Sequence, residues 1–121
     1  ANALRLVKAG QVTGHQHYDF VLGVPGALPA SVANLVYLSQ QVPEGATWCV
    51  AGMGRHQLPM ATAAMAMGGN VRGGCEGNSY YRRGELASSN AQLVARVARI
   101  ATELGRDIAT PDEARDILGL R

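Results

Sequence analysis

Three short segments of the chain are dominated by apolar and small residues. They are Tyr18–Val24, Ala46–Met53 and Asn70–Cys75, and each has Gly or Pro nearby. Their length and their β-branched, aromatic or small side chains predict β-strands. The apolar runs are nearly continuous rather than alternating, which predicts strands that are buried on both faces, as in a parallel sheet.

Helical patterns occupy the intervals between these segments and most of the chain after them. Val32, Leu35 and Val36 lie on one face of the first pattern, and that pattern ends before a Val-Pro pair. Ser89 and Thr110 are each followed three positions later by Gln or Glu, which predicts capping boxes at two helix starts. The predicted helices span residues 29–41, 58–67, 89–104 and 110–118, and residues 4–7 resemble the last turns of another helix.

Strands and helices therefore alternate along the chain before two final helices. This order predicts an α/β protein in which parallel βα repeats are joined by crossover helices. Three parallel strands leave two bare edges, which a self-sufficient domain rarely does. From the pattern, we expect residues 1–121 to form a single unit, with a sheet that another chain completes or that is the tail of a larger barrel.

Composition narrows the classes of function. The chain has 121 residues, of which 47% are hydrophobic and 17% charged, and its net charge is +2. These values suit one soluble globular unit. The weak positive charge, the few aromatic residues and the lack of a basic block argue against a nucleic-acid partner.

The two cysteines and the distribution of apolar residues predict a cytoplasmic protein. Cys49 and Cys75 lie in apolar, strand-like surroundings, and we expect both to be buried, reduced thiols rather than a disulfide. No apolar run reaches the roughly 18 residues that span a bilayer, and no signal-peptide pattern is present at the start. We therefore expect no membrane partner.

Polar residues follow the predicted strands, where parallel α/β proteins collect their functional groups. Glu76 and Asn78 follow the third strand, and Arg55 and His56 follow the second. Because the carboxyl ends of parallel strands meet at one edge, these residues are predicted to lie together. Glu76 is the one acid among three glycines, which makes it the main candidate for chemistry.

Arg72 precedes Glu76 by four positions in the predicted third strand. Side chains along a strand alternate between its two faces with a period of two residues, so the side chains of Arg72 and Glu76 are expected to point to the same face. A buried guanidinium needs a carboxylate or an anionic ligand, because an unpaired internal charge costs several kcal/mol. The spacing alone leaves a structural Arg–Glu pair and an anion-binding site as equal alternatives.

His15 and His17 have a spacing that is common in metal chelates, because both imidazoles lie on one side of an extended chain. They precede the first strand, whereas Glu76 follows the third. A strand of about six residues at about 3.3 Å per residue separates the two faces. We therefore expect these histidines to be solvated loop residues that share no metal with Glu76.

Several ordered motifs resemble those of the beta-keto acid cleavage enzymes. They are "FVLGVPGALPAS", "GMGRHQLPM", "NVRGGCEGN" and "GELASSNAQLV", and the likeness runs from about Asp19 to the end of the chain. It implies the C-terminal part, about three strands, of a zinc-dependent TIM (β/α)8 barrel. Such an enzyme would convert a beta-keto acid and acetyl-CoA to acetoacetate and a new acyl-CoA. The resemblance further implies a homo-oligomer, a zinc-ligand role for Glu76 and a catalytic role for Arg72.

The chain departs from the family pattern at two points. Gly77 stands where the family has an aspartate that resembles a proton-transfer partner of the arginine, a kind of group that contributes roughly 10²–10⁴-fold in rate. Two further zinc ligands of the family are histidines from an early strand, which is outside these residues. A catalytic zinc usually needs three protein ligands, and Glu76 supplies one.

These observations leave three hypotheses. The first is the C-terminal portion of a zinc-dependent beta-keto acid cleavage enzyme. The second is a truncated or degenerate fragment without catalysis that assembles through its open sheet edges. The third is a different barrel enzyme, such as an aldolase, in which Arg72 holds a substrate carboxylate or phosphate. The particular beta-keto acid is not evident from the sequence, and Arg55 is the basic residue we consider for contact with CoA.

Overall fold

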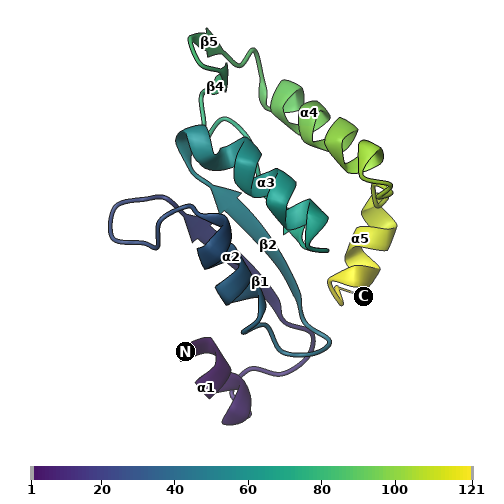
Figure 1. Ribbon diagram of the computed structural model, residues 1–121. Coiled ribbons are helices and arrows are strands. Elements are labelled where there is room, and N and C mark those ends of the chain that lie inside the picture. The colour runs from purple at the N-terminus through teal and green to yellow at the C-terminus, as the bar shows by residue number, and fades with distance from the viewer. Residues whose placement is uncertain (1, 121) are drawn as a thin grey trace.

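A three-stranded parallel sheet with crossover helices on one face forms the centre of the molecule (Figure 1). The computed structural model describes residues 2–120. The strands lie in the order β1 (His17–Leu22), β2 (Thr47–Gly52) and β3 (Asn70–Val71). Helices α2 (Val32–Ser39) and α3 (Gln57–Ala66) connect them. The predicted parallel α/β arrangement is therefore observed.

The remaining elements surround this unit. They are α1 (Asn2–Lys8), the 3₁₀ turn η1 (Gly54–His56), the antiparallel hairpin of β4 (Tyr80–Arg82) and β5 (Glu85–Leu86), α4 (Asn90–Glu103) and α5 (Pro111–Ile117). In Figure 1, α4 lies beside α3, and the hairpin lies at the opposite end of the molecule from α1 and α5. No helix among residues 2–120 is long and apolar enough to cross a membrane.

The predicted helices are observed with small shifts in their bounds. Ser31 caps α2 by accepting a hydrogen bond from the Asn34 N–H at 3.2 Å, so that helix begins later than predicted. Leu35 is fully buried, whereas Val32 and Val36 on the same predicted face are exposed. The predicted apolar face of α2 is thus only partly covered.

The two predicted capping boxes differ in the structure. At α5, the Thr110 hydroxyl accepts from the Glu113 N–H, and the Glu113 carboxylate accepts from the Thr110 N–H, so the box is complete. At α4, the Ser89 hydroxyl accepts from the Gln92 N–H as predicted. The Gln92 side chain, however, accepts from the N–H of residue 88 rather than from Ser89, so that box is half formed.

The third strand is shorter than predicted. It contains only Asn70 and Val71, and residues 72–77 form a loop and a turn. Gly74 has φ of +141°, which side-chain-bearing residues rarely adopt, and this conformation takes the chain out of the sheet. The prediction of a strand to Cys75 was therefore wrong.

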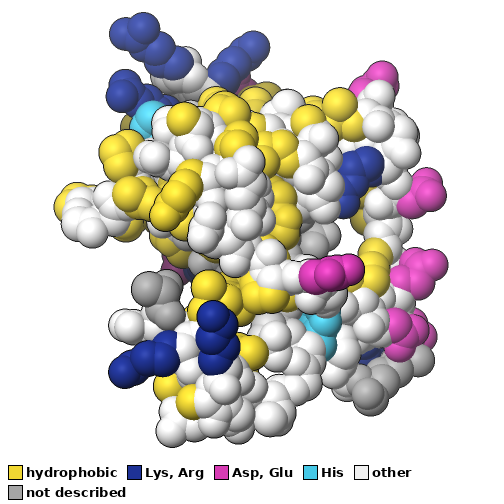
Figure 2. Space-filling model, turned by 60° about the horizontal axis from the view of Figure 1, so that its bottom comes forward, with side chains coloured by type: hydrophobic (Ala, Val, Ile, Leu, Met, Phe, Trp, Pro, Cys, Tyr) yellow, Lys and Arg dark blue, Asp and Glu magenta, His cyan; other side chains and the backbone are white. Residues whose placement is uncertain are grey.

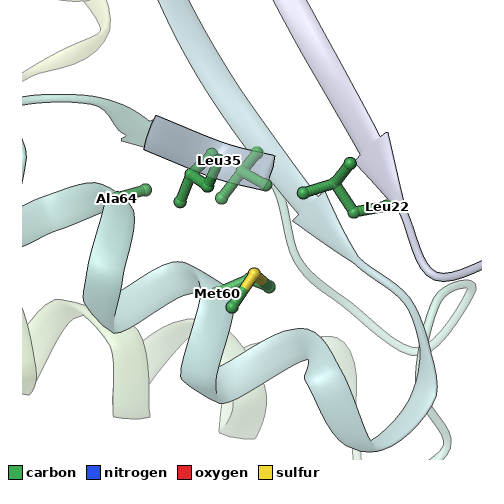
Figure 3. Packing of buried hydrophobic residues seen from close by; sticks show 5 residues of the cluster. Leu22, Leu35, Met60 and Ala64 are labelled. Carbon is green, nitrogen blue, oxygen red and sulfur yellow. The ribbon is translucent and has the colours of Figure 1, made fainter. Parts of the chain in front are cut away.

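The core lies between the sheet and its two crossover helices. Leu22, Leu35, Met60 and Ala64 converge there from β1, α2 and α3 (Figure 3). The Trp48 ring packs beside this cluster, and its centroid lies 5.8 Å from that of another aromatic ring, Phe20. This core holds β1 and β2 in register and so positions the loops that follow them.

Candidate active site

The loops that follow β2 and β3 are joined at the carboxyl ends of the strands. The Gly54 N–H donates to the carbonyl of Gly77 at 2.6 Å. The buried amide of Gln57, at the start of α3, donates to the Gly74 carbonyl at 2.9 Å. The turn that carries Glu76 therefore lies directly beside the β2–α3 loop, as the parallel topology predicts.

The start of α4 holds the same turn from another side. The Asn90 side-chain oxygen accepts a hydrogen bond from the Cys75 N–H at 2.6 Å. A Cβ atom on Gly74 would lie 2.7 Å from that oxygen. Gly74 is thus required both by its positive φ and by the close approach of Asn90.

A small cavity of about 40 Å³ remains between the loops. It is lined by Ala51, Gly52, Met53, Gln57, Arg72, Gly73, Gly74, Glu76 and Gly77.

Arg72 lies between two carboxylates at this cavity. Its Nη1 contacts Asp19 Oδ2 at 2.8 Å, and its Nη2 contacts Glu76 Oε2 at 3.3 Å. The hydrogen bond and charge of Asp19, followed by those of Glu76, raise the pKa of Arg72 above its usual value. The guanidinium is therefore a permanent cation with a fixed orientation.

Arg72 and Glu76 are adjacent, as expected, but for a different reason and in a different environment. Both lie outside β3, so the turn rather than strand alternation brings them together. The Arg72 side chain is 50% exposed and that of Glu76 is 85% exposed, so the expected buried guanidinium is wrong. The exposed surfaces of both groups are available to a ligand.

Asp19 is a member of this cluster that the sequence analysis did not single out. It lies on β1 beside Cys49 of β2 in the sheet register, and its carboxylate reaches Arg72 across 53 residues of sequence. The signal that could have found it is one acid within the apolar run of β1. A charged residue in such a strand needs a partner, and Arg72 supplies it.

Cys49 donates its thiol hydrogen to Asp19 Oδ1 at 3.2 Å. Burial, and then the hydrogen bond to Asp19, raise the pKa of Cys49 to about 12, so the thiol stays protonated. Both cysteines are free, as predicted, although Cys75 is half-buried rather than buried. Cys49 therefore supports the position of the Asp19 carboxylate.

The two early histidines lie apart from this cluster. His17 is the first residue of β1, and Nε2 of His15 and Nδ1 of His17 lie 2.9 and 2.7 Å from the Thr47 hydroxyl oxygen. Both are exposed, as expected of solvated residues. Residues 2–120 contain no group of three side chains that could hold a metal ion. The described His, Cys, Asp and Glu residues therefore supply fewer than three ligands to any one metal ion, and the exposed carboxylate of Glu76 is available as one of them.

Sequence comparison assigns the chain to a known family. The family described as beta-keto acid cleavage enzyme matches residues 1–120. This chain belongs to the beta-keto acid cleavage enzyme family. The resemblance inferred from the motifs is thereby confirmed over nearly the whole chain.

Curated members of the beta-keto acid cleavage enzyme family are similar to this chain over most of its length. The 3-keto-5-aminohexanoate cleavage enzymes of Fusobacterium nucleatum and Acetoanaerobium sticklandii are 56% and 46% identical over 119 and 118 residues. A 3-oxoadipate:acetyl-CoA acetyltransferase of Cupriavidus necator is 40% identical over 121 residues. Each match covers 98% of this chain and 43% of the relative. The chain thus spans less than half of the length of these relatives.

Proposed function

We propose that this chain is the C-terminal portion of a (β/α)8-barrel enzyme that exchanges an acyl unit between a beta-keto acid and acetyl-CoA. The products are acetoacetate and a new acyl-CoA. The observation that carries the proposal is the Arg72 guanidinium, which lies between Asp19 and Glu76 at the carboxyl ends of parallel strands in a chain of this family. Relatives whose names include acetyl-CoA transfer support the reaction class.

The surface of the chain supports the proposal that further barrel strands cover it. Its accessible surface is 7882 Å², whereas a folded monomer of its 12.7 kDa mass exposes about 6,200 Å². Within residues 2–120, β1 and β3 each pair with β2 alone. Apolar side chains on β1 and α2 are exposed, namely Val21, Val32, Val36 and Tyr37. Additional strands and helices on both sides would bury them.

We propose that Glu76 is one ligand of a catalytic zinc ion whose other ligands come from outside residues 1–121. The Glu76 side chain is 85% exposed and faces the cavity lined by Arg72, so its carboxylate is accessible to an ion. Zinc would supply a Lewis acid that polarises the oxygens of the substrate. Because Arg72 also contacts Glu76, the guanidinium orients the carboxylate that is proposed to bind the metal.

Arg72 is proposed to bind the anionic oxygens of the substrate. Its guanidinium is fixed by Asp19 on one side and by Glu76 on the other, and half of its side chain remains exposed. Fixed donors aimed at developing negative charge are a large contribution to catalysis, and removal of one costs about 10²–10³-fold in rate. Gly77 has no carboxylate for acid/base catalysis, and Asp19 is proposed to supply one in its place.

The test of this function uses the protein expressed from its complete reading frame. Acetoacetate formation from acetyl-CoA and a panel of beta-keto acids is measured together with zinc content. We expect Arg72→Met to lower kcat/KM about 10²-fold or more. The matched control is Arg115→Met, which removes an arginine paired with Asp112 on exposed α5 and is expected to leave the rate unchanged. A purified, zinc-free protein without exchange activity would instead support the non-catalytic alternative.

A second pair of variants tests Asp19. Asp19→Asn is expected to lower kcat about 10²-fold. In that background, Gly77→Asp is expected to recover part of the loss. A Cβ on Gly77 would lie 3.2 Å from Met53 Sδ and 3.4 Å from Gln57 Nε2, so the substitution requires the flexible Met53 side chain to shift by a few tenths of an ångström. Unchanged kcat in Asp19→Asn, with the protein folded, would contradict the role of Asp19.

The assembly and location of the complete protein are part of the same proposal. We propose a homo-oligomer that works in the cytoplasm on small-molecule substrates. The open edges of β1 and β3 in the described residues support a need for neighbouring strands, from the same protein or from a partner chain. Turnover of a beta-keto acid without CoA would favour the aldolase alternative.

A further inference from the structure

A groove of about 790 Å³ lies between the start of α3 and the β4–β5 hairpin, beside the cavity of the proposed active site. It is formed by the η1–α3 segment on one side and by the hairpin and α4 on the other. Its lining residues are Arg55, Leu58, Pro59, Asn78, Tyr80, Tyr81, Arg82, Arg83, Gly84 and Arg96. The sequence analysis made no prediction for the hairpin that forms half of this groove.

The groove is strongly positive. Four arginines line it, and no aspartate or glutamate does. The nearest ion pair is that of Arg82 with Glu85 at 2.5 Å, which neutralises one of the four. Arg55 and Arg83 are exposed and form no ion pair within the described residues. In Figure 2, one group of Lys and Arg side chains lies at the upper left and a second group lies at the lower left, whereas most Asp and Glu side chains lie along the right, the side of α4 and α5.

One arginine of the groove is held in place by its neighbours. Arg96 Nη1 donates to the Tyr81 carbonyl, and its guanidinium carbon lies 4.3 Å from the centroid of the Tyr81 ring. Arg96 Nε is buried without a hydrogen-bond partner among the described residues. The Tyr81 hydroxyl is in addition 3.4 Å from Arg99 Nη2. The groove thus has a rigid wall of stacked arginine and tyrosine rather than mobile side chains alone.

An exposed aromatic ring stands at the same groove. Tyr80 is 51% exposed, although it is a large side chain on a short strand. Planar rings of this kind stack on nucleobases, and arginine clusters bind phosphate groups. Together the ring and the cations are complementary to a ligand that joins a base to several phosphates.

The position of the groove relates it to the active site. Arg55 follows Gly54 and Asn78 follows Gly77, and Gly54 and Gly77 are joined by a hydrogen bond of 2.6 Å. Two residues that line the groove are therefore direct neighbours in sequence of the glycines that join the β2–α3 loop to the turn of Glu76. In (β/α)8 barrels, the loops after the last two strands frequently form a phosphate site. Under the proposed function, β2 and β3 are those strands.

We propose that this groove binds the adenosine phosphate portion of acetyl-CoA, with the thioester end directed toward Arg72 and Glu76. The inference rests on the proposed function for the identity of the ligand, while the charge and the aromatic ring of the groove stand independently of it. The exposed Arg55 and Arg83 bind the phosphates, and Tyr80 stacks on the base. In this arrangement, the residues that bind the nucleotide are different from Arg72 and Glu76, which are proposed to act at the reacting atoms.

The test uses adenosine 3′,5′-bisphosphate, which carries the base, the 3′-phosphate and the first 5′-phosphate of CoA but lacks the second 5′-phosphate and the thiol-bearing arm. Its binding to the protein from the complete reading frame is measured by calorimetry at low and high salt. We expect saturable binding that weakens with salt, and a Kd at least tenfold higher for Arg55→Met/Arg83→Met and for Tyr80→Ala. Arg115→Met serves as the control, because Arg115 lies on α5 outside the groove, and its Kd is expected to be unchanged.

Kinetics separate this inference from the proposed function. In an active protein, the groove variants are expected to raise the KM for acetyl-CoA about tenfold with kcat nearly unchanged, because the substituted side chains are proposed to contact the nucleotide and not the reacting thioester. An active protein that does not bind adenosine 3′,5′-bisphosphate, or binds it equally after the substitutions, would overturn the groove assignment and leave the proposed function standing. An inactive protein that binds it through these arginines would overturn the function and retain a nucleotide site. Equal affinity for inorganic phosphate would overturn the role of the base.

Discussion

At the scale of single residues, Arg72 shows how a solvent-accessible cation is given a fixed orientation. Two carboxylates contact it, one from β1 and one from its own turn. The Asp19 carboxylate accepts a further hydrogen bond from the protonated thiol of Cys49. This chain of contacts links a buried position of the sheet to the exposed face where we propose that the substrate binds.

The state of Cys49 leads to a prediction about reactivity. Because burial and Asp19 raise its pKa to about 12, the thiol is protonated at pH 8, and protonated thiols are poor nucleophiles. We expect iodoacetamide at pH 8 to modify the half-buried Cys75 before Cys49, as measured by mass spectrometry of peptides. In urea both should react, which serves as the control. Equal rates in the folded protein would contradict the assigned environment.

The same raised pKa has a defined effect on stability. A group that holds its proton more tightly in the folded state contributes stability that is fully present below its unfolded pKa of about 8.5. This contribution is lost as the pH rises from there toward about 12. Cys49→Ser would therefore be less sensitive to alkaline pH than the unsubstituted protein.

At the scale of elements, local capping chemistry and distant packing determine different features. Ser31, Ser89 and Thr110 begin three helices through side-chain hydrogen bonds to the backbone within the first turn. At the end of α3, by contrast, Arg106 donates to the carbonyls of Met65 and Gly69 from about 40 residues away in sequence. The starts of α4 and α5 were predicted from neighbours in the sequence, whereas the Arg106 contact depends on the folded chain.

The complete capping box of α5 leads to a prediction about pH. The hydrogen bonds that the Glu113 carboxylate accepts from Thr110 lower the pKa of Glu113. The contribution of the ionised Glu113 carboxylate to stability is therefore fully present above the ordinary glutamate pKa of about 4.3. It is lost as the pH falls through the lowered pKa that Glu113 has in the folded protein. Amide hydrogen exchange in the first turn of α5 should accelerate in that range.

The start of α4 is a matched control within the same chain. Its cap uses Ser89 and Gln92, which do not titrate. Exchange there should show no comparable change in acid, and Glu113→Gln should remove the pH response of α5. Parallel acid responses of the two helix starts would contradict the assignment to Glu113.

At the scale of the whole molecule, the core is compact on the helix face of the sheet, while both sheet edges and part of α2 are uncovered. The close approach of the Trp48 ring to the turn before β3 depends on glycine at position 69. A Cβ on Gly69 would lie 2.3–2.6 Å from three atoms of the Trp48 ring. That ring packs against the core, so it cannot move without disturbing Phe20 and its neighbours.

We therefore expect Gly69→Ala to lower the free energy of unfolding by about 1–3 kcal/mol, since overpacking displaces a well-packed ring. Trp48 is the single tryptophan of the 121 residues, so its fluorescence in a urea titration reports the change. Gly73→Ala is the control, because its nearest contact would be an ordinary 3.6 Å from Gln57 and its φ is not positive. Equal midpoints for the two variants would show that the Trp48 ring can shift at little cost.

The sequence by itself determined the order of the three sheet strands and of the helices, though not the β4–β5 hairpin, because the continuous apolar runs of the strands and the capping residues of the helices are local properties. It also determined the family, through motifs that lie close together along the chain, and the adjacency of Arg72 and Glu76. Only the tertiary structure decided that Asp19 contacts Arg72, that Arg72 is half-exposed and that four arginines from three segments line one groove. These features depend on residues that folding brings together across the sheet and the hairpin, and no pattern of neighbours along the chain encodes such distances.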